Sequence, residues 1–219
     1  MTIVITCGPA WEAIDGMRRL TNASTGQLGA VLADALADAG HRVLLYRGDG
    51  ATAKLPMRTV EMHAFSTNDD LAFQLAERAG YEHVHAFFHA AALCDFRVAR
   101  ITDSLGVERK DSKIPSRAGR ILLELEPATK VLPQLRRWWP EARIVGWKYE
   151  LGGSRDDALA AAWRQLHDAR TDVCVLNGSA WGAGFAWCEA PGIVIPCPDA
   201  AALGSHVVEW LQIDPRIPT

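Results

Sequence analysis

Residues 28–46 read LGAVLADALADAGHRVLLY, and this stretch predicts a helix followed directly by a strand. Apolar side chains recur at helical spacing from Leu28 to Ala39, so they form one buried stripe, and Gly40 is a typical stop signal. The apolar run His41–Tyr46 that follows has the composition of a buried strand. A helix that leads into such a strand is typical of α/β proteins.

The alternation of strands and helices continues over the rest of the chain. The first strand is predicted at Ile3–Cys7, where an unbroken apolar run indicates burial on both faces of a sheet. Further strands are predicted at Met57–Ala64, Val84–Ala92, Ile144–Tyr149 and Asp172–Leu176. Further helices are predicted at 66–79, Thr129–Trp139, Asp156–Ala169 and Asp199–Leu211. We therefore predict an α/β fold: a single domain over residues 1–219, with a Rossmann-like parallel sheet and helices on both faces.

Residues 97–126 interrupt this alternation. They are polar and contain RKDSKIPSRAGR at 109–120, directly before the strand-like run ILLELE at 121–126. Long irregular segments inside a compact domain are usually functional or disordered. We predict a mobile loop that leads into an antiparallel hairpin, forming a small β excursion used in dimerisation.

Composition narrows the classes of function. The chain has 219 residues, of which 49% are hydrophobic and 22% charged, and its formal net charge is −3. Because no block of basic residues stands out, we expect no nucleic-acid binding. No apolar run reaches the roughly 20 residues that a membrane helix needs, and no signal peptide is recognisable. Five scattered cysteines without a CxxC pair predict reduced thiols in a cytoplasmic protein. Since no membrane helix is predicted, we also expect no membrane binding.

The segment before the first helix, RRLTNASTG at 18–26, is polar for a strand-to-helix connection. Ser24 and Gly26 would lie at the amino terminus of the helix, where unpaired N–H groups favour a bound anion. Gly26 and Gly29 would let a phosphate or a neighbouring strand approach the backbone. An ordinary capped helix is the alternative. The fingerprint GxGxxG is missing, and the link from Gly8 to Gly26 is long for a simple Rossmann turn.

Three histidines could imitate a metal site. His83, His85 and His89 have the same parity on one predicted strand. No carboxylate or cysteine stands at matching spacing, so we interpret them as ordinary strand histidines. We predict no metal site built from protein ligands.

Six separated segments resemble, in this order, the phosphopantothenoylcysteine synthetase (phosphopantothenate–cysteine ligase) family. They are ITCGPAWEAID at 5–15, RRLTNASTGQLG at 18–29, HAAALCDF at 89–96, SKIPS at 112–116, GWKYE at 146–150 and VCVLNG at 173–178. The resemblance implies a domain that activates 4'-phosphopantothenate with a nucleoside triphosphate, releases pyrophosphate and transfers the acyl group to cysteine. Ser116 and Gln165 stand near places where bacterial fused forms carry lysines, so the chain resembles the stand-alone form.

The resemblance also implies roles for residues near the first turn. Asn22 would stabilise the acyl-nucleotide, and Arg18 would reach the pantothenate side from a partner subunit. The nucleotide phosphates would be cradled by the motif's serine and glycines and by the glycine after the first strand. These positions are Ser24, Gly26, Gly29 and Gly8.

Further along the chain, the family's A-A-x-x-D motif falls on Ala91, Ala92 and Asp95, which would bind the phosphopantothenate arm. Lys113 matches a loop lysine that closes over the phosphates. Trp147 lies where the family has a ring that stacks on the base, and Asn177 matches an asparagine near the base.

The resemblance finally implies Mg²⁺, CTP or ATP as co-substrate, no FMN, and a homodimer. Pro9 and Ala10 depart from the family pattern, and 178–184 (GSAWGAG) has no counterpart. Two other hypotheses remain open. One is an NADP-dependent Rossmann-like reductase, in which Arg47 would face a 2'-phosphate; the other is a diverged, non-catalytic nucleotide-binding protein.

Overall fold

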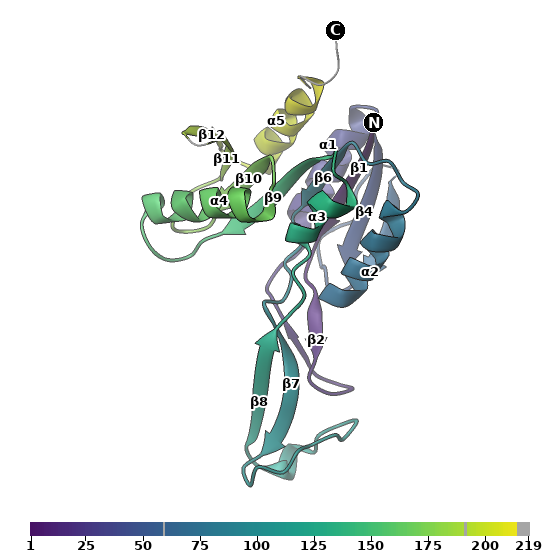
Figure 1. Cartoon of the computed structure of the whole chain (residues 1–219), viewed down its shortest axis with the longest axis vertical. Helices are drawn as coiled ribbons and strands as arrows, with labels where there is room; N and C mark the ends of the chain where they lie inside the picture. The colour runs from purple at the N-terminus through teal and green to yellow at the C-terminus, as the bar shows by residue number, and fades with distance from the viewer. Residues whose placement is uncertain (59, 191, 214–219) are drawn as a thin grey trace.

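The computed structural model describes residues 1–58, 60–190 and 192–213 and contains one large mixed sheet (Figure 1). Its eight strands lie in the order β12-β11-β10-β9-β6-β1-β4-β5. They are β1 (Thr2–Cys7), β4 (Arg42–Gly48), β5 (Glu61–Phe65), β6 (Ala86–His89), β9 (Arg143–Tyr149), β10 (Val173–Asn177), β11 (Phe185–Ala190) and β12 (Ile193–Cys197). All neighbours pair in parallel except β10–β11 and β11–β12, which are antiparallel.

Helices cover both faces of this sheet, as predicted. On one face, α1 (Gln27–Asp38) and α5 (Ala200–Gln212) pack on each other and share a core with β1, β4 and β9. The other face carries α2 (Asn68–Ala79), α3 (Leu132–Trp138) and α4 (Arg155–Ala169). Among the described residues, no helix is long and apolar enough to cross a membrane.

The strand order contains a topological switch point between β1 and β6. From β1 the chain proceeds outward through α1 to β4 and β5, and it then returns to β6 on the other side of β1 and continues to β9 and β10. In open α/β sheets, ligands bind at the carboxyl edge of the strands at such a point. The fold therefore places a candidate site beyond the ends of β1 and β6.

An arm projects from the sheet at the same edge (Figure 1). Its main part is the antiparallel pair β7 (Phe96–Asp103) and β8 (Ile121–Pro127). Beside it lies a short hairpin of β2 (Trp11–Ala13) and β3 (Arg19–Thr21), and a 3₁₀ turn (Ser116–Ala118) precedes β8. The β excursion is thus confirmed, but the predicted loop begins only after Asp103, because Phe96–Asp103 form a strand.

Several element boundaries were wrong. The strand predicted at Met57–Ala64 begins only at Glu61, because the backbone N–H of Arg58 binds the Asp34 carboxylate of α1 (2.8 Å). The strand predicted at Val84–Ala92 is confined to Ala86–His89. The antiparallel strands β11 and β12 were not predicted at all.

The helix predicted at Thr129–Trp139 was also too long. It starts at Leu132, because the side chains of Thr129 and Lys130 are held by Asp69 and Asp95 before the helix begins. Ala128 is bound to the same loop, since its N–H donates to the Asp95 carbonyl (3.0 Å).

Gly29 of α1 packs directly against Cys7 of β1. A Cβ atom at this position would lie 2.1 Å from Cys7 Cβ in β1. We expect Gly29→Ala to lower the free energy of unfolding by about 1–3 kcal/mol, because helix and strand would have to move apart. Urea denaturation would measure this change. Gly152→Ala is the matched control, since a Cβ there meets no atom within 4 Å; equal midpoints for both variants would contradict the argument.

Candidate functional site

The switch point is built by backbone hydrogen bonds that continue beyond β1 and β6. The Gly8 carbonyl accepts from the Ala92 N–H (2.9 Å), and the Ala92 carbonyl accepts from the Ala10 N–H (3.1 Å). The side chain of Asn22 donates through Nδ2 to the Leu93 carbonyl (2.7 Å). Gly8, Asn22 and the A-A-x-x-D segment, which are far apart in the sequence, therefore meet at one place.

The amino terminus of α1 adjoins this place. Gly26 is the residue before the helix and has φ of 77°, and Gly8 has φ of 79°, so both occupy the left-handed region that favours glycine. A Cβ on Gly26 would lie 3.4 Å from Gly8 Cα and 3.1 Å from Ala51 Cβ. The turn is therefore tight, and half-buried Ser24 lies directly before it.

The predicted glycines thus have different local surroundings. Gly8 and Gly26 pack against each other at the turn, whereas Gly29 is one helical turn further and buried against β1. Of the two partners that the sequence allowed for Gly29, a phosphate or a neighbouring strand, the structure shows the strand.

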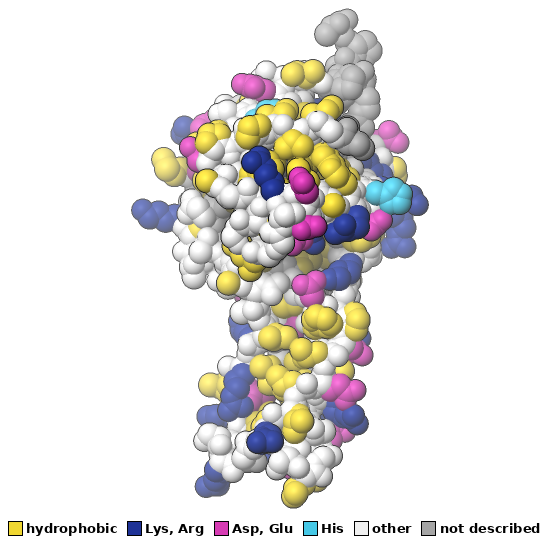
Figure 2. Space-filling view, turned by 90° about the vertical axis from the view of Figure 1, so that its left-hand side faces the viewer, with side chains coloured by type: hydrophobic (Ala, Val, Ile, Leu, Met, Phe, Trp, Pro, Cys, Tyr) yellow, Lys and Arg dark blue, Asp and Glu magenta, His cyan; other side chains and the backbone are white. Residues whose placement is uncertain are grey.

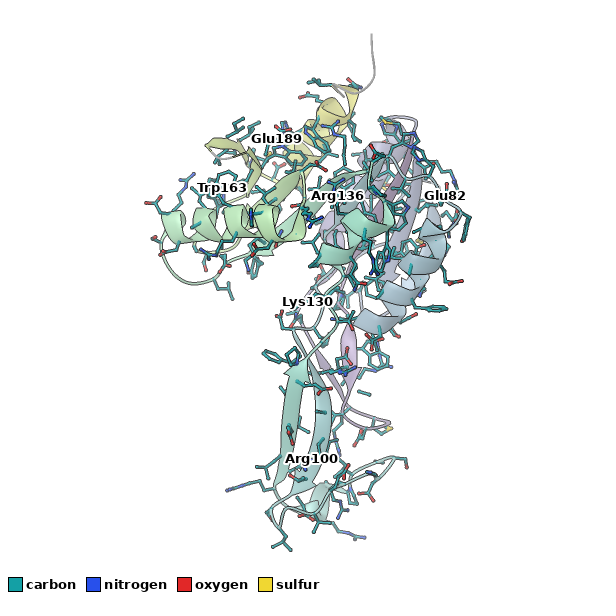
Figure 3. The ribbon with its side chains drawn as sticks, in the orientation of Figure 1. Glu82, Arg100, Lys130, Arg136, Trp163 and Glu189 are labelled. Atoms are coloured by element: carbon teal, nitrogen blue, oxygen red, sulfur yellow. The ribbon has the colours of Figure 1, made fainter. Side chains whose placement is uncertain are left out.

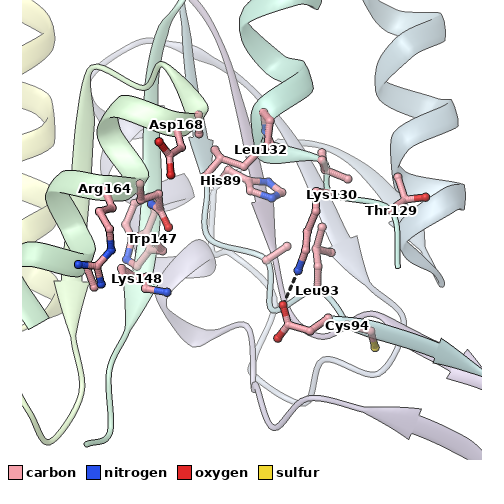
Figure 4. Close-up of a pocket in the computed structure, with 17 residues that line it drawn as sticks. His89, Leu93, Cys94, Thr129, Lys130, Leu132, Trp147, Lys148, Arg164 and Asp168 are labelled. Atoms are coloured by element: carbon pink, nitrogen blue, oxygen red, sulfur yellow. Dashed lines mark hydrogen bonds and ion pairs between the residues drawn. The ribbon is translucent and has the colours of Figure 1, made fainter. Parts of the chain in front are cut away.

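A cleft of about 450 Å³ opens between α3 and α4, beside the ends of β6 and β9 (Figure 4). Three predicted residues line it, namely Ala91, Asp95 and Trp147. The lining also contains polar residues for which no binding role was predicted, namely His89, Thr129, Lys130, Lys148, Arg164 and Asp168. Such a volume lies in the usual range for small-molecule sites, about 300–1,000 Å³.

The charges of the cleft are partly paired. Lys130 binds the carboxylate of Asp95, as the dashed line in Figure 4 marks, and Figure 3 places Lys130 where the arm joins the body. Lys148 lies 3.2 Å from Glu150. Arg164 is exposed and forms no ion pair among the described residues. Basic side chains at this mouth favour an anionic ligand. Lys130 and Arg164 stand outside the six motifs, so no pattern in the sequence indicated them.

Trp147 and Asn177 lie further along the same edge. They belong to the neighbouring strands β9 and β10, and their parity directs both toward the face that carries α1 and α5. Trp147 is half-buried against that core, and its buried Nε1 has no hydrogen-bond partner among the described residues. The backbone carbonyl of Asn177 accepts from the Glu150 N–H (2.9 Å).

Arg18 and Lys113 are on the arm and not at the sheet edge. The guanidinium of Arg18 binds the Asp15 carboxylate (2.6 Å) and the Ile114 carbonyl (3.0 Å). Asp15 also accepts from the N–H of Ile114 (3.1 Å), and the Gly16 N–H donates to the Ser112 carbonyl (2.8 Å). This clasp fixes the loop of exposed Lys113 to the hairpin tip, so the two predicted cations are neighbours.

Hydrogen bonds to the carboxylate of Asp15 lower its pKa. The backbone N–H of Met17, with those of Ile114 and Arg18, holds the pKa of Asp15 below its usual range. Because the folded pKa is depressed, the stabilisation is present above the usual carboxyl pKa and is lost as the pH falls through the folded value.

We expect Asp15→Asn to release the loop at neutral pH, with several-fold faster trypsin cleavage after Lys113 and Arg117. In the wild-type protein, the loop should be released only under acid conditions. There, a protease that is active at low pH would replace trypsin and report cleavage within the same loop. Asp111→Asn is the control, because Asp111 lies in the same loop but, within the part of the chain that the structure describes, pairs only with Arg109. Equal cleavage of both variants would refute the clasp.

Comparison with known proteins agrees with this geometry. Residues 1–196 match the protein family described as "DNA/pantothenate metabolism flavoprotein C-terminal domain". A curated relative, the coenzyme A biosynthesis bifunctional protein CoaBC of Thermococcus kodakarensis, is 29% identical over 175 residues, which are 80% of this chain and 40% of the relative. The chain thus spans about two fifths of the length of this curated relative.

Solved structures show the same fold. The DNA/pantothenate metabolism flavoprotein from Streptococcus pneumoniae has a TM-score of 0.84 at 22% identity, over 97% of this chain and 98% of that one. The Cab2 mutant H337A in complex with phosphopantothenate-cysteine has a TM-score of 0.75 at 16% identity, over 96% and 86% of the two chains. With the match over residues 1–196, the chain belongs to the family of the DNA/pantothenate metabolism flavoprotein C-terminal domain, as the sequence motifs predicted.

Proposed function

We propose that this protein is a nucleotide-dependent ligase that joins 4'-phosphopantothenate to L-cysteine through an acyl-nucleotide, with release of pyrophosphate, in coenzyme A biosynthesis. The observation that carries the proposal is the bond from Asn22 Nδ2 to the Leu93 carbonyl (2.7 Å). It joins the two motifs that would hold the nucleotide and the acid, at the switch point of the sheet. The name of the curated relative points to coenzyme A biosynthesis, and the ligand of the Cab2 complex, phosphopantothenate-cysteine, is the product that this reaction would form.

In the first step, a carboxylate oxygen of the acid attacks the α-phosphorus of the nucleotide and pyrophosphate leaves. The turn at Ser24 and Gly26, together with Gly8, would hold the phosphates at the positive end of α1. Ala91, Ala92 and Asp95 would hold the acid next to them. Asn22 keeps one N–H and its carbonyl oxygen available for the mixed anhydride, and an amide cannot attack it as a nucleophile.

In the second step, the cysteine amine attacks the acyl carbon, the bond from carbon to the phosphate oxygen breaks, and the nucleoside monophosphate leaves. The amine loses its proton to water as the amide forms. Neither step is a redox reaction, so we propose that the ligase needs no FMN. The base would lie toward Trp147 and Asn177, with CTP or ATP as the co-substrate.

A carboxylate and a triphosphate repel each other, so cations are needed at this edge. Lys130, Lys148 and Arg164 line the cleft in this chain. Among the described residues, no cluster of three His, Cys, Asp or Glu side chains could hold a metal ion. We propose that Mg²⁺ is held mainly by phosphate oxygens of the nucleotide and by waters. Bound in this way, Mg²⁺ would neutralise charge on the phosphates.

Arg18 and Lys113 would act from the arm, which favours a homodimer in which the arm of one subunit approaches the edge of the other. The arm carries exposed apolar side chains (Figure 2). On β8, Leu123 and Leu125 face one side and are 38% and 43% exposed. The opposite side carries Glu124 and Glu126, paired with arginines of β7. A two-stranded ribbon is marginally stable alone, so its apolar side is suited to a second copy.

The reductase hypothesis finds less support. Arg47 Nη2 donates to the carbonyls of Ala51 (2.9 Å) and Ala53 (2.6 Å), so this guanidinium holds a loop of its own chain. A non-catalytic protein would bind nucleotide and acid without turnover.

The first test is pyrophosphate release from CTP or ATP with phosphopantothenate, cysteine and magnesium. We expect turnover by the wild type and a loss of about 10²-fold in kcat for Asn22→Ala, because a donor to the acyl-nucleotide is removed. Gln27→Ala, in the exposed first turn of α1, is the control. Absence of pyrophosphate with both nucleotides would reject the ligase, and an unchanged Asn22 variant would reject the role of this amide.

The second test is the oligomeric state in light scattering after size exclusion. We expect a dimer for the wild type and a monomer for Leu123→Asp, because the charge would be buried against the second copy. Leu122→Asp changes the charged side of the same strand and should remain dimeric. A wild-type monomer, or equal masses for the two variants, would contradict this interface.

A further inference from the structure

His89 forms a buried polar contact at the floor of the cleft. It is the last residue of β6 and only 6% exposed, and its Nδ1 lies 2.7 Å from the hydroxyl of Thr6 in β1, which is fully buried. Burial lowers the pKa of His89 to about 4, so the imidazole is neutral near pH 7. The Thr6 hydroxyl thus fixes the orientation of a neutral ring.

The other ring nitrogen is open to the cleft. His89 Nε2 has no hydrogen-bond partner among the described residues, although the ring lines the cleft near Leu132 and Lys130 (Figure 4). Buried polar groups are nearly always paired, with protein, water or ligand. In either tautomer, the contact with Thr6 leaves Nε2 able to donate or accept one hydrogen bond.

The space in front of His89 is open because the neighbouring residue of β9 is a glycine. Gly146 of β9 is the register partner of His89. A Cβ at Gly146 would lie 2.6 Å from Gln165 Nε2 and 3.0 Å from Leu132 Cδ2, so any side chain there would fill the cleft. The remaining walls include apolar Leu93 and Pro133, and Arg164 stands among the lining residues.

We propose that His89 Nε2 hydrogen-bonds a hydroxyl or amide group of the acid substrate, and that Thr6 is the positioning residue for this contact. The inference rests on the proposed function and deepens it. The chain of 4'-phosphopantothenate has apolar carbons, neutral polar groups and an anionic end. These match the apolar walls of the cleft, the neutral Nε2 of His89 and the nearby cations.

Gln and Met variants of His89 provide a matched test, because their side chains have similar length but only Gln retains a hydrogen-bonding end. We expect His89→Met to raise the KM for phosphopantothenate about tenfold, the equivalent of about 1.4 kcal/mol. His89→Gln should stay within about threefold of the wild type, as the loss of only part of one hydrogen bond implies. The KM values for nucleotide and cysteine should not change. Thr6→Val should resemble the Met variant, and Thr6→Ser the wild type.

Equal KM values for the Gln and Met variants, or equal shifts for all three substrates, would overturn the inference. If the Met variant does not fold, as judged by circular dichroism, the Thr6 pair decides. If the wild type releases no pyrophosphate, the proposed function fails by itself. Calorimetric binding of phosphopantothenate alone, without nucleotide, then still decides whether His89 contacts it, and undiminished binding by the variants would refute the contact.

Discussion

The backbone pairing of residues 6–10 with residues 90–92 is the constraint on which the candidate site depends. Three hydrogen bonds join them: Ala90 N–H to the Thr6 carbonyl (3.0 Å), Ala92 N–H to the Gly8 carbonyl (2.9 Å) and Ala10 N–H to the Ala92 carbonyl (3.1 Å). Parallel strands usually diverge into separate loops at their carboxyl ends, but here they remain paired. The A-A-x-x-D segment is therefore held against the glycine turn by the sheet itself, and a site on such a rigid element needs little reorganisation when a ligand binds.

Much of the sheet could be predicted because its central strands are unbroken apolar runs. β11 and β12 are mostly apolar, and they were missed because they form a short antiparallel pair at one end of the sheet, outside the alternation of strands and helices. β7 resembled a loop because Arg97 and Arg100 appear as solvated charges in the sequence. Their acidic partners, Glu126 and Glu124, stand on the opposite strand and become neighbours only in the folded arm.

The candidate site was predictable to the extent that its residues follow neighbouring strands. Gly8, Ala92, Trp147 and Asn177 lie beyond or at the ends of four adjacent strands, so topology alone brings them to one edge. Arg18 and Lys113 belong to the arm, whose position no local pattern specifies. His89 had no signal as a binding residue, because a histidine at the end of an apolar strand is ordinarily paired within the protein.

Pro9 is accommodated by the same pairing. Gly8 and Ala10 direct their bonding groups toward Ala92, so the backbone groups of the residue between them point to the opposite side, toward β4. Proline lacks only the N–H on that side, and the pairing with β6 is intact. On the β4 side, Cβ atoms on Gly48 and Gly50 would lie 2.2 Å from the Pro9 carbonyl oxygen and 3.3 Å from its ring. The departure at Pro9 is thus matched by Gly48 at the end of β4 and by Gly50 in the turn that follows, and the contact between the two motifs is undisturbed.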